Sequence, residues 1–77
     1  MTLSVFIDSV SACFSSSSEV KPETRFREME EWSSMQALIV IATVDEDFGV
    51  TLPEKEFRKA QTFKDLFDLT VLHLENV

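Results

Sequence analysis

The side chains that could perform chemistry in this 77-residue sequence are few and lie far apart. Cys13 is the only cysteine and His73 the only histidine, so they can form neither an internal disulfide nor a usual four-ligand zinc site. Cys13 follows apolar and small residues, which favours packing over reactivity. His73 lies near the chain end, where exposure or weak packing is expected. No acid, base and nucleophile are grouped in a cluster, so the sequence predicts that the protein is not an enzyme.

Two adjacent serines, Ser33 and Ser34, precede the most strongly helical segment of the chain. A serine in this place commonly caps the helix, because its hydroxyl accepts a hydrogen bond from a free backbone N–H group. Capping is therefore the common role of a serine at this place.

The charge balance limits the classes of partner. The sequence contains seven Lys and Arg residues and 14 Asp and Glu residues, which gives a formal net charge of −7. This excess argues against binding to nucleic acid or to an anionic membrane surface, both of which require clustered basic residues. It suits a partner protein with a basic patch. No apolar run approaches the ~20 residues of a membrane span, and we expect a cytoplasmic protein.

The first half of the chain predicts one helix followed by a long connection. Apolar residues share one face of a helix over residues 2–14, and the serines at 15–18 should end it. Residues 19–33 are charged and irregular, and the proline at 22 disfavours helix before it. We expect three apolar residues to pin this connection onto the core: Phe26, Met29 and Trp32.

The second half predicts three more helices. The strongest spans 34–48, with a core face at Leu38, Ile41, Val44 and Phe48, and Gly49 stops it. Because Ile39, Val40 and Ala42 are also apolar, this helix is either central or has a second, partner-facing side.

An extended link over 50–53 then leads to a short helix at 54–60, anchored by Phe57. Thr62 caps a last helix at about 63–74, whose apolar face comprises Phe63, Leu66, Phe67, Thr70, Val71 and Leu74. With no strand pattern, the expected fold is a single all-α domain over 1–77. It is a small four-helix bundle with a long first connection and a short third helix.

Four segments in matching register resemble the acyl carrier protein family. Residues 32–36 (Trp-Ser-Ser-Met-Gln) occupy the place of the family's Asp-Ser-Leu-Asp motif, and Phe26 precedes Ser34 at the family's distance. Phe48 follows at the family's distance and begins a Phe-Gly-Val-Thr-Leu-Pro link. Residues 59–66 (Lys-Ala-Gln-Thr-Phe-Lys-Asp-Leu) are similar to the run that begins the family's last helix. The resemblance covers about residues 3–74.

The resemblance implies a carrier that holds acyl groups as thioesters on a 4′-phosphopantetheine arm, linked through a phosphodiester to Ser34. Ser34 rather than Ser33 is implied because both flanking distances, to Phe26 and to Phe48, fit it. Two departures from the family are present: Ser33 stands where the family has Asp, and Gln36 and Ile39 stand where acids are usual. These departures favour a specialised acyl-transfer pathway over fatty acid synthesis. An unmodified helical interaction domain with a carrier-like fold is the alternative.

The resemblance also implies partners and a cargo site. The expected partners of this monomer are a phosphopantetheinyl transferase and acyl-transferring or condensing enzymes with basic docking patches. The expected docking residues are Met35, Ile39, Ala42, Asp45 and Glu46, unless Ile39 is buried and the acids only form a solvated helix end. An acyl chain could enter beside Val40, Val44 and Phe57, unless the phenylalanine-rich core leaves no room.

Overall fold

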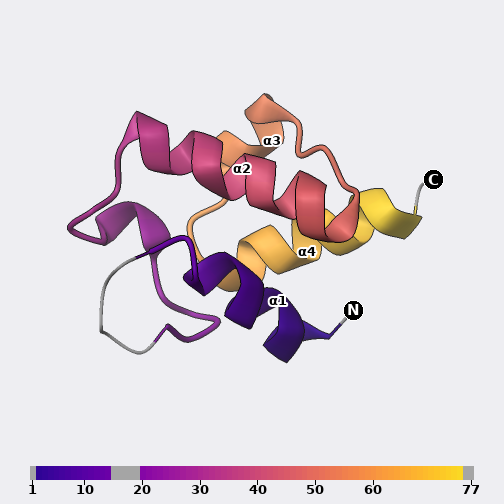
Figure 1. Cartoon of the computed structure of the whole chain (residues 1–77), viewed down its shortest axis with the longest axis horizontal. Coiled ribbons are helices and arrows are strands. Elements are labelled where there is room, and N and C mark those ends of the chain that lie inside the picture. Colours follow the sequence, from indigo (N-terminus) through magenta and orange to yellow (C-terminus); the bar gives the residue numbers. More distant parts are fainter. Residues whose placement is uncertain (1, 15–19, 76–77) are drawn as a thin grey trace.

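A computed structural model of the chain describes residues 2–14 and 20–75 and is all-α over these residues, as expected (Figure 1). The elements are α1 (Leu3–Ser11), the short 3-10 helix η1 (Phe26–Glu28), α2 (Ser34–Phe48), α3 (Glu54–Lys59) and α4 (Phe63–Glu75). Over the described ranges there is no strand, although an isolated β-bridge pairs Arg25 with Thr62. The predicted four-helix bundle with a short third helix is therefore confirmed.

Helix α1 is shorter than the apolar pattern indicated. The side chain of Thr2 caps its start by accepting a hydrogen bond from the Val5 N–H group at 3.2 Å. It ends at Ser11 because the N–H groups of Cys13 and Phe14 donate to the carbonyls of Val10 and Ser11 in a tight turn. The expected break at 15–18 lies outside the described residues.

Helix α2 has the predicted bounds and most of the predicted core face: Val44 is buried, and Ile41 and Phe48 pack against the core. Gly49 ends it in the left-handed region, with φ of 69°, and its N–H group donates to the Asp45 carbonyl at 2.9 Å. The fully buried residues are Val40 and Val44, whereas Leu38, expected in the core, is 63% exposed. The prediction for Leu38 was wrong because α2 is apolar on several sides, so the spacing alone fits more than one face.

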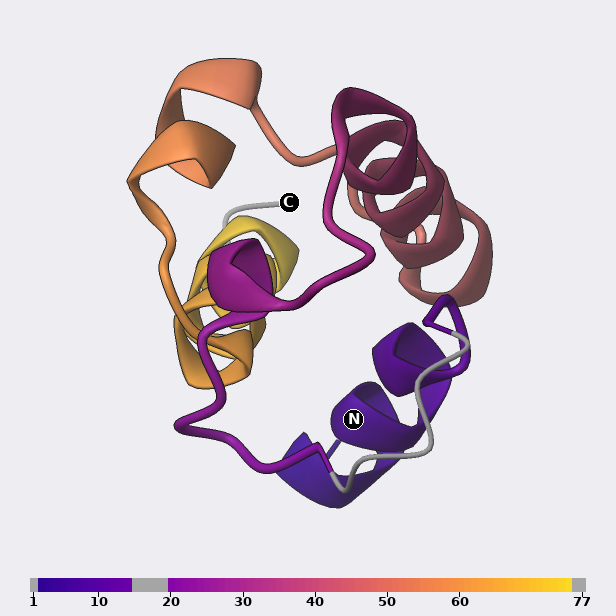
Figure 2. The same cartoon turned by 90° about the vertical axis from the view of Figure 1, so that its left-hand side faces the viewer.

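The connection before α2 is pinned to the core by the three residues expected to do so. Phe26 is buried, and Met29 and Trp32 pack against the core while partly exposed. The carbonyls of Pro22 and Thr24 also accept hydrogen bonds from Lys64 and Phe63, at 2.8 and 3.2 Å. These contacts place the connection across the start of α4, as Figure 2 shows with η1 in front of that helix.

Helices α3 and α4 begin where the sequence indicated. Pro53 precedes α3, and Phe57 anchors this helix in the core. Leu74 of α4, expected on the apolar face, is 40% exposed, and Leu69 packs against the core instead. His73 is also less free than expected, because its Nε2 lies 2.7 Å from Glu56 Oε2 and joins α4 to α3.

Asp65 and Thr62 cap α4 reciprocally. Thr62 Oγ1 accepts from the Asp65 N–H group at 3.1 Å, and Asp65 Oδ2 accepts from the N–H groups of Gln61 and Thr62 at 2.9 and 3.1 Å. The Gln61 hydrogen bond is the main cause that lowers the pKa of the Asp65 carboxyl; burial opposes it, and Thr62 and the charge of Arg25 add to it.

This pKa predicts how stability depends on pH. Because the pKa of Asp65 is lower in the folded state, the carboxylate stabilises the fold above about pH 4 and loses that effect as the pH falls through the folded-state pKa. Asp65→Asn should cost about 1 kcal/mol at pH 7 and clearly less at pH 3, by urea unfolding. Asp68→Asn, at an exposed ion pair with Lys64, is the control. An equal cost of Asp65→Asn at both pH values would contradict this role.

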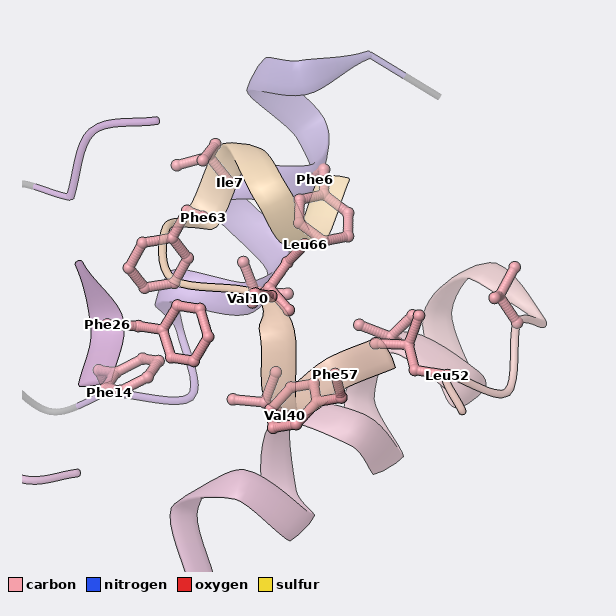
Figure 3. Packing of buried hydrophobic residues seen from close by; sticks show 13 residues of the cluster. Phe6, Ile7, Val10, Phe14, Phe26, Val40, Leu52, Phe57, Phe63 and Leu66 are labelled. Atoms are coloured by element: carbon pink, nitrogen blue, oxygen red, sulfur yellow. The ribbon is translucent and has the colours of Figure 1, made fainter. Parts of the chain in front are cut away.

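One core joins the helices. Helix α1 packs against both α2 and α4, and α3 packs against α4. Phenylalanine rings from distant segments meet in this core, where Phe63 lies 5.6 Å from Phe14 and 5.8 Å from Phe26 between ring centroids (Figure 3). The described residues therefore form a bundle that holds the start of α2 at its surface, beside the long connection (Figure 2).

Candidate functional site

The two serines at the start of α2 have different environments. Ser33 is the N-cap residue, and its Oγ accepts a hydrogen bond from the Gln36 N–H group at 3.1 Å. Ser34 is the first residue of the helix and is exposed, and its hydroxyl makes no hydrogen bond within 2–14 and 20–75. Because Ser33 supplies the cap, the hydroxyl of Ser34 stays free at the positive end of the helix.

A set of side-chain hydrogen bonds fixes this end of α2 against α1. Gln36 Nε2 donates to the Cys13 carbonyl at 2.6 Å, and Cys13 Sγ donates to Thr43 Oγ1 at 3.1 Å. Further along, the Ser9 hydroxyl donates to the Asp47 carboxylate. Sequence reasoning noted Gln36 only as a missing acid, and no pattern in the sequence could have shown that its amide reaches α1.

The face of α2 opposite the core carries an exposed strip. Met35, Ile39, Ala42 and Glu46 are all exposed and follow one another at spacings of four, three and four residues, which place them on one side of a helix. Met35 is 66% and Ile39 40% exposed, so the alternative in which Ile39 is buried is wrong. Sequence reasoning missed Leu38, which is exposed and adds to the apolar part of this face.

The acidic end of α2 is only partly free. Asp45, Glu46 and Asp47 are all exposed. Asp47 accepts the hydrogen bond from Ser9, and Asp45 accepts one from Thr51 Oγ1 at 3.4 Å. The Glu46 side chain makes no hydrogen bond or ion pair within the described part of the chain, so it is open to a partner.

The residues expected to line an acyl-chain site lie in the interior. Val40 and Val44 of α2 and Phe57 of α3 are buried members of the same hydrophobic cluster, in which Figure 3 labels Val40 and Phe57. The structure thus brings the three together in one cluster, as part of a packed core.

A groove that the sequence did not indicate lies between α3 and α4. It measures about 430 Å³, is open to solvent and is lined by Glu56, Lys59, Ala60, Asp65, Asp68, Leu69 and Leu72. Its charged groups come from the two helices that the Glu56–His73 contact joins.

Over the described residues, no helix has both the length and the apolarity needed to cross a membrane.

Comparisons with known proteins identify relatives of this chain. An acyl carrier protein of Rubrobacter xylanophilus is 38% identical over 56 residues, which cover 73% of this chain and 69% of that protein. Acyl carrier proteins of Helicobacter hepaticus and Thermosynechococcus vestitus are 35% and 34% identical, over 63% and 62% of their own lengths and 62% and 65% of this chain. No family model and no solved structure matches the chain. The identity with relatives of this one name shows that the chain belongs to the acyl carrier protein family.

Proposed function

We propose that this protein carries acyl groups on a 4′-phosphopantetheine arm attached to Ser34 and that it catalyses no reaction itself. The observation that carries this proposal is the free, exposed hydroxyl of Ser34 at the first position of α2, beside a different serine that caps the helix. When bound, the arm would supply a terminal thiol that holds the acyl group as a thioester. The family relationship supports a carrier role.

The start of α2 fits such a group for two reasons. The hydroxyl of Ser34 is not needed by the fold, so a phosphodiester can form there without breaking a described hydrogen bond. The N–H groups of a first helical turn have no partners within the helix and favour an attached phosphate. Cap and attachment point are thus separate residues, and neither function displaces the other.

The partner face that we propose is the strip of Met35, Ile39 and Ala42 with the acidic residues Asp45 and Glu46 beyond it. Its apolar part begins beside Ser34, so an enzyme docked there would reach the arm. Its acids suit a basic patch on a phosphopantetheinyl transferase or on an acyl-transferring or condensing enzyme. Because its first half is apolar rather than acidic, we favour partners in a specialised acyl-transfer pathway over those of fatty acid synthesis.

Substitutions on this face should weaken docking without unfolding the protein. Met35→Gln combined with Ile39→Gln should lower the kcat/KM of the transferase for this protein by about tenfold, because truncating the few residues that anchor an interface costs more than about 1 kcal/mol. Leu72→Gln is the matched control, since Leu72 is 50% exposed but lies on α4. Equal effects of the α2 and α4 variants would contradict docking at the strip.

We also propose that a carried acyl chain can lie between α2 and α3, beside Val40, Val44 and Phe57. Each buried methylene is worth about 0.8 kcal/mol, so a chain of medium length could gain several kcal/mol. Chemical shifts of the backbone amides of these residues should then change when the arm is loaded with such a chain.

The direct test is incubation with coenzyme A and a phosphopantetheinyl transferase of broad specificity, followed by intact mass measurement. A mass gain of one 4′-phosphopantetheine group is expected. If several transferases give no gain, the exposed strip of α2 becomes the functional surface of an unmodified helical interaction domain, which is the second candidate.

A further inference from the structure

A single arginine ties the connection before α2 to the end of α3. Arg27 of η1 donates from Nε to the Ala60 carbonyl at 2.8 Å and from Nη2 to the Phe57 carbonyl at 2.6 Å. The Phe57 carbonyl also accepts a hydrogen bond from the Ala60 N–H group at 3.1 Å, so Arg27 adds a second donor there. Carbonyls at the C-terminal end of a helix attract positive charge, which favours the guanidinium group at this end of α3. Hydrogen bonds from an ionised donor are stronger than neutral ones, so the link resists separation of α3 from the connection.

Aromatic rings surround the same guanidinium group. Its central carbon lies 5.1 Å from the ring centroid of Phe26, 5.4 Å from that of Phe57 and 5.7 Å from that of Trp32. The Trp32 ring also stacks on Phe57, at 6.3 Å between centroids. We call these four residues the Arg27 clamp. The clamp joins Trp32, two positions before Ser34, to a residue of α3 that faces the core.

A carried chain cannot enter beside Val40, Val44 and Phe57 while α3 stays in place, because Val40 and Val44 are fully buried and Phe57 is 3% exposed. Entry requires α3 to move away from the connection, which breaks both hydrogen bonds of Arg27. Breaking two hydrogen bonds from a charged donor costs about as much free energy as the burial of at least about four methylene groups gains.

We propose that Arg27 determines cargo specificity, by holding α3 closed so that short acyl groups stay outside the fold and only longer chains open it. This inference rests on the proposed function, and it names the cargo that the closed protein suits: acyl groups of about four carbons or fewer. Short cargo would then remain available on the arm, because nothing in the core competes for it.

The experiment loads the protein from acetyl-, butanoyl-, hexanoyl- and octanoyl-coenzyme A and confirms each product by intact mass. The fluorescence of Trp32, the only tryptophan in the chain, reports on opening of the clamp. In the native protein, acetyl and butanoyl cargo should leave the emission unchanged. In Arg27→Gln the emission should already change with butanoyl, and the ratio of buried to free cargo should rise about fourfold per methylene.

Arg58→Gln is the matched control, because Arg58 is an arginine of α3 itself but is exposed and bonds only Glu54 of the same helix among the described residues. It should behave like the native protein. Arg27→Lys keeps the charge but not the forked donors, so in this variant the clamp should open at intermediate chain lengths. This variant replaces Arg27→Gln in the experiment if Arg27→Gln does not fold. The same dependence on chain length in the native protein and the Arg27 variants would overturn the inference.

The clamp can also be judged in the unmodified protein. Arg27→Gln should speed hydrogen exchange of the α3 amides by at least about a hundredfold, because two charged hydrogen bonds are lost, while Arg58→Gln leaves it unchanged. Unchanged exchange in Arg27→Gln would refute the clamp even where loading succeeds. Absence of any mass gain would instead remove the proposed function and the cargo specificity with it, whatever the exchange shows.

Discussion

Ser34→Ala abolishes the mass gain from coenzyme A and a phosphopantetheinyl transferase, whereas Ser33→Ala retains it: this is the result that we expect from the two environments at the start of α2. Ser34 has the free hydroxyl, and the hydroxyl of Ser33 is engaged with Gln36. Only a hydroxyl that the fold does not use can accept a substituent without loss of the cap. Intact mass spectrometry after an overnight reaction measures the outcome directly.

The stability of the two variants should differ as well, with Ser33→Ala less stable than Ser34→Ala. Ser33→Ala removes the cap and should cost about 1 kcal/mol, which lowers the Tm of a domain of this size by about 4–8 °C. Ser34→Ala should leave the Tm nearly unchanged, because its side chain makes no described hydrogen bond. If Ser33→Ala is the variant that loses the mass gain, the attachment point is Ser33 and the proposed division of roles is reversed.

The helices themselves could be predicted from sequence because their ends carry local signals. Ser33 and Gly49 bracket α2 by a side-chain cap and by a left-handed backbone, and both depend on the residue type alone. The same holds for Thr62 at the start of α4. Such signals act over a few residues, so they can be recognised without knowledge of the rest of the fold.

The face that each helix buries was harder to predict. Residues 37–42 of α2 are all apolar, so both a face containing Leu38 and one containing Val40 match the helical spacing. The choice between them depends on where α1 and the other helices pack, which is tertiary information. Leu74 was misplaced for a related reason, since it lies near the end of α4 where Leu69 packs on the core and Leu74 does not.

The contacts of single polar side chains at the site could not be predicted at all. Gln36 reaches the carbonyl of Cys13, and Arg27 reaches those of Phe57 and Ala60, across large separations in sequence. Every residue has a backbone carbonyl, so no sequence motif can identify which carbonyl accepts such a hydrogen bond. The choice of Ser34 as the attachment point rests on the family resemblance, through its separations in sequence from Phe26 and Phe48, and it stays a prediction. The side chains that hold the start of α2 in place could not be predicted in this way.

Phe26→Ala should destabilise the fold more than any substitution considered above, by about 3–5 kcal/mol. Phe26 is fully buried, and its ring lies 4.9 Å from Trp32, 5.8 Å from Phe63 and 5.9 Å from Phe57 between centroids. The alanine therefore leaves a cavity where the connection, α3 and α4 meet. Because small domains are stable by only about 5–15 kcal/mol, this loss would consume much of the stability.

Thermal unfolding followed by circular dichroism tests this expectation, with a fall in Tm of more than about 12 °C as the predicted result. Phe26→Leu should cost less, because it keeps most of the buried volume, and Leu72→Ala at an exposed site of α4 should cost within about 0.5 kcal/mol. A loss for Phe26→Ala no larger than that for Leu72→Ala would show that the connection is not anchored through Phe26. The Arg27 clamp would then lack its support as well, because Phe26 is both the neighbour of Arg27 in η1 and one of the rings that its guanidinium group covers.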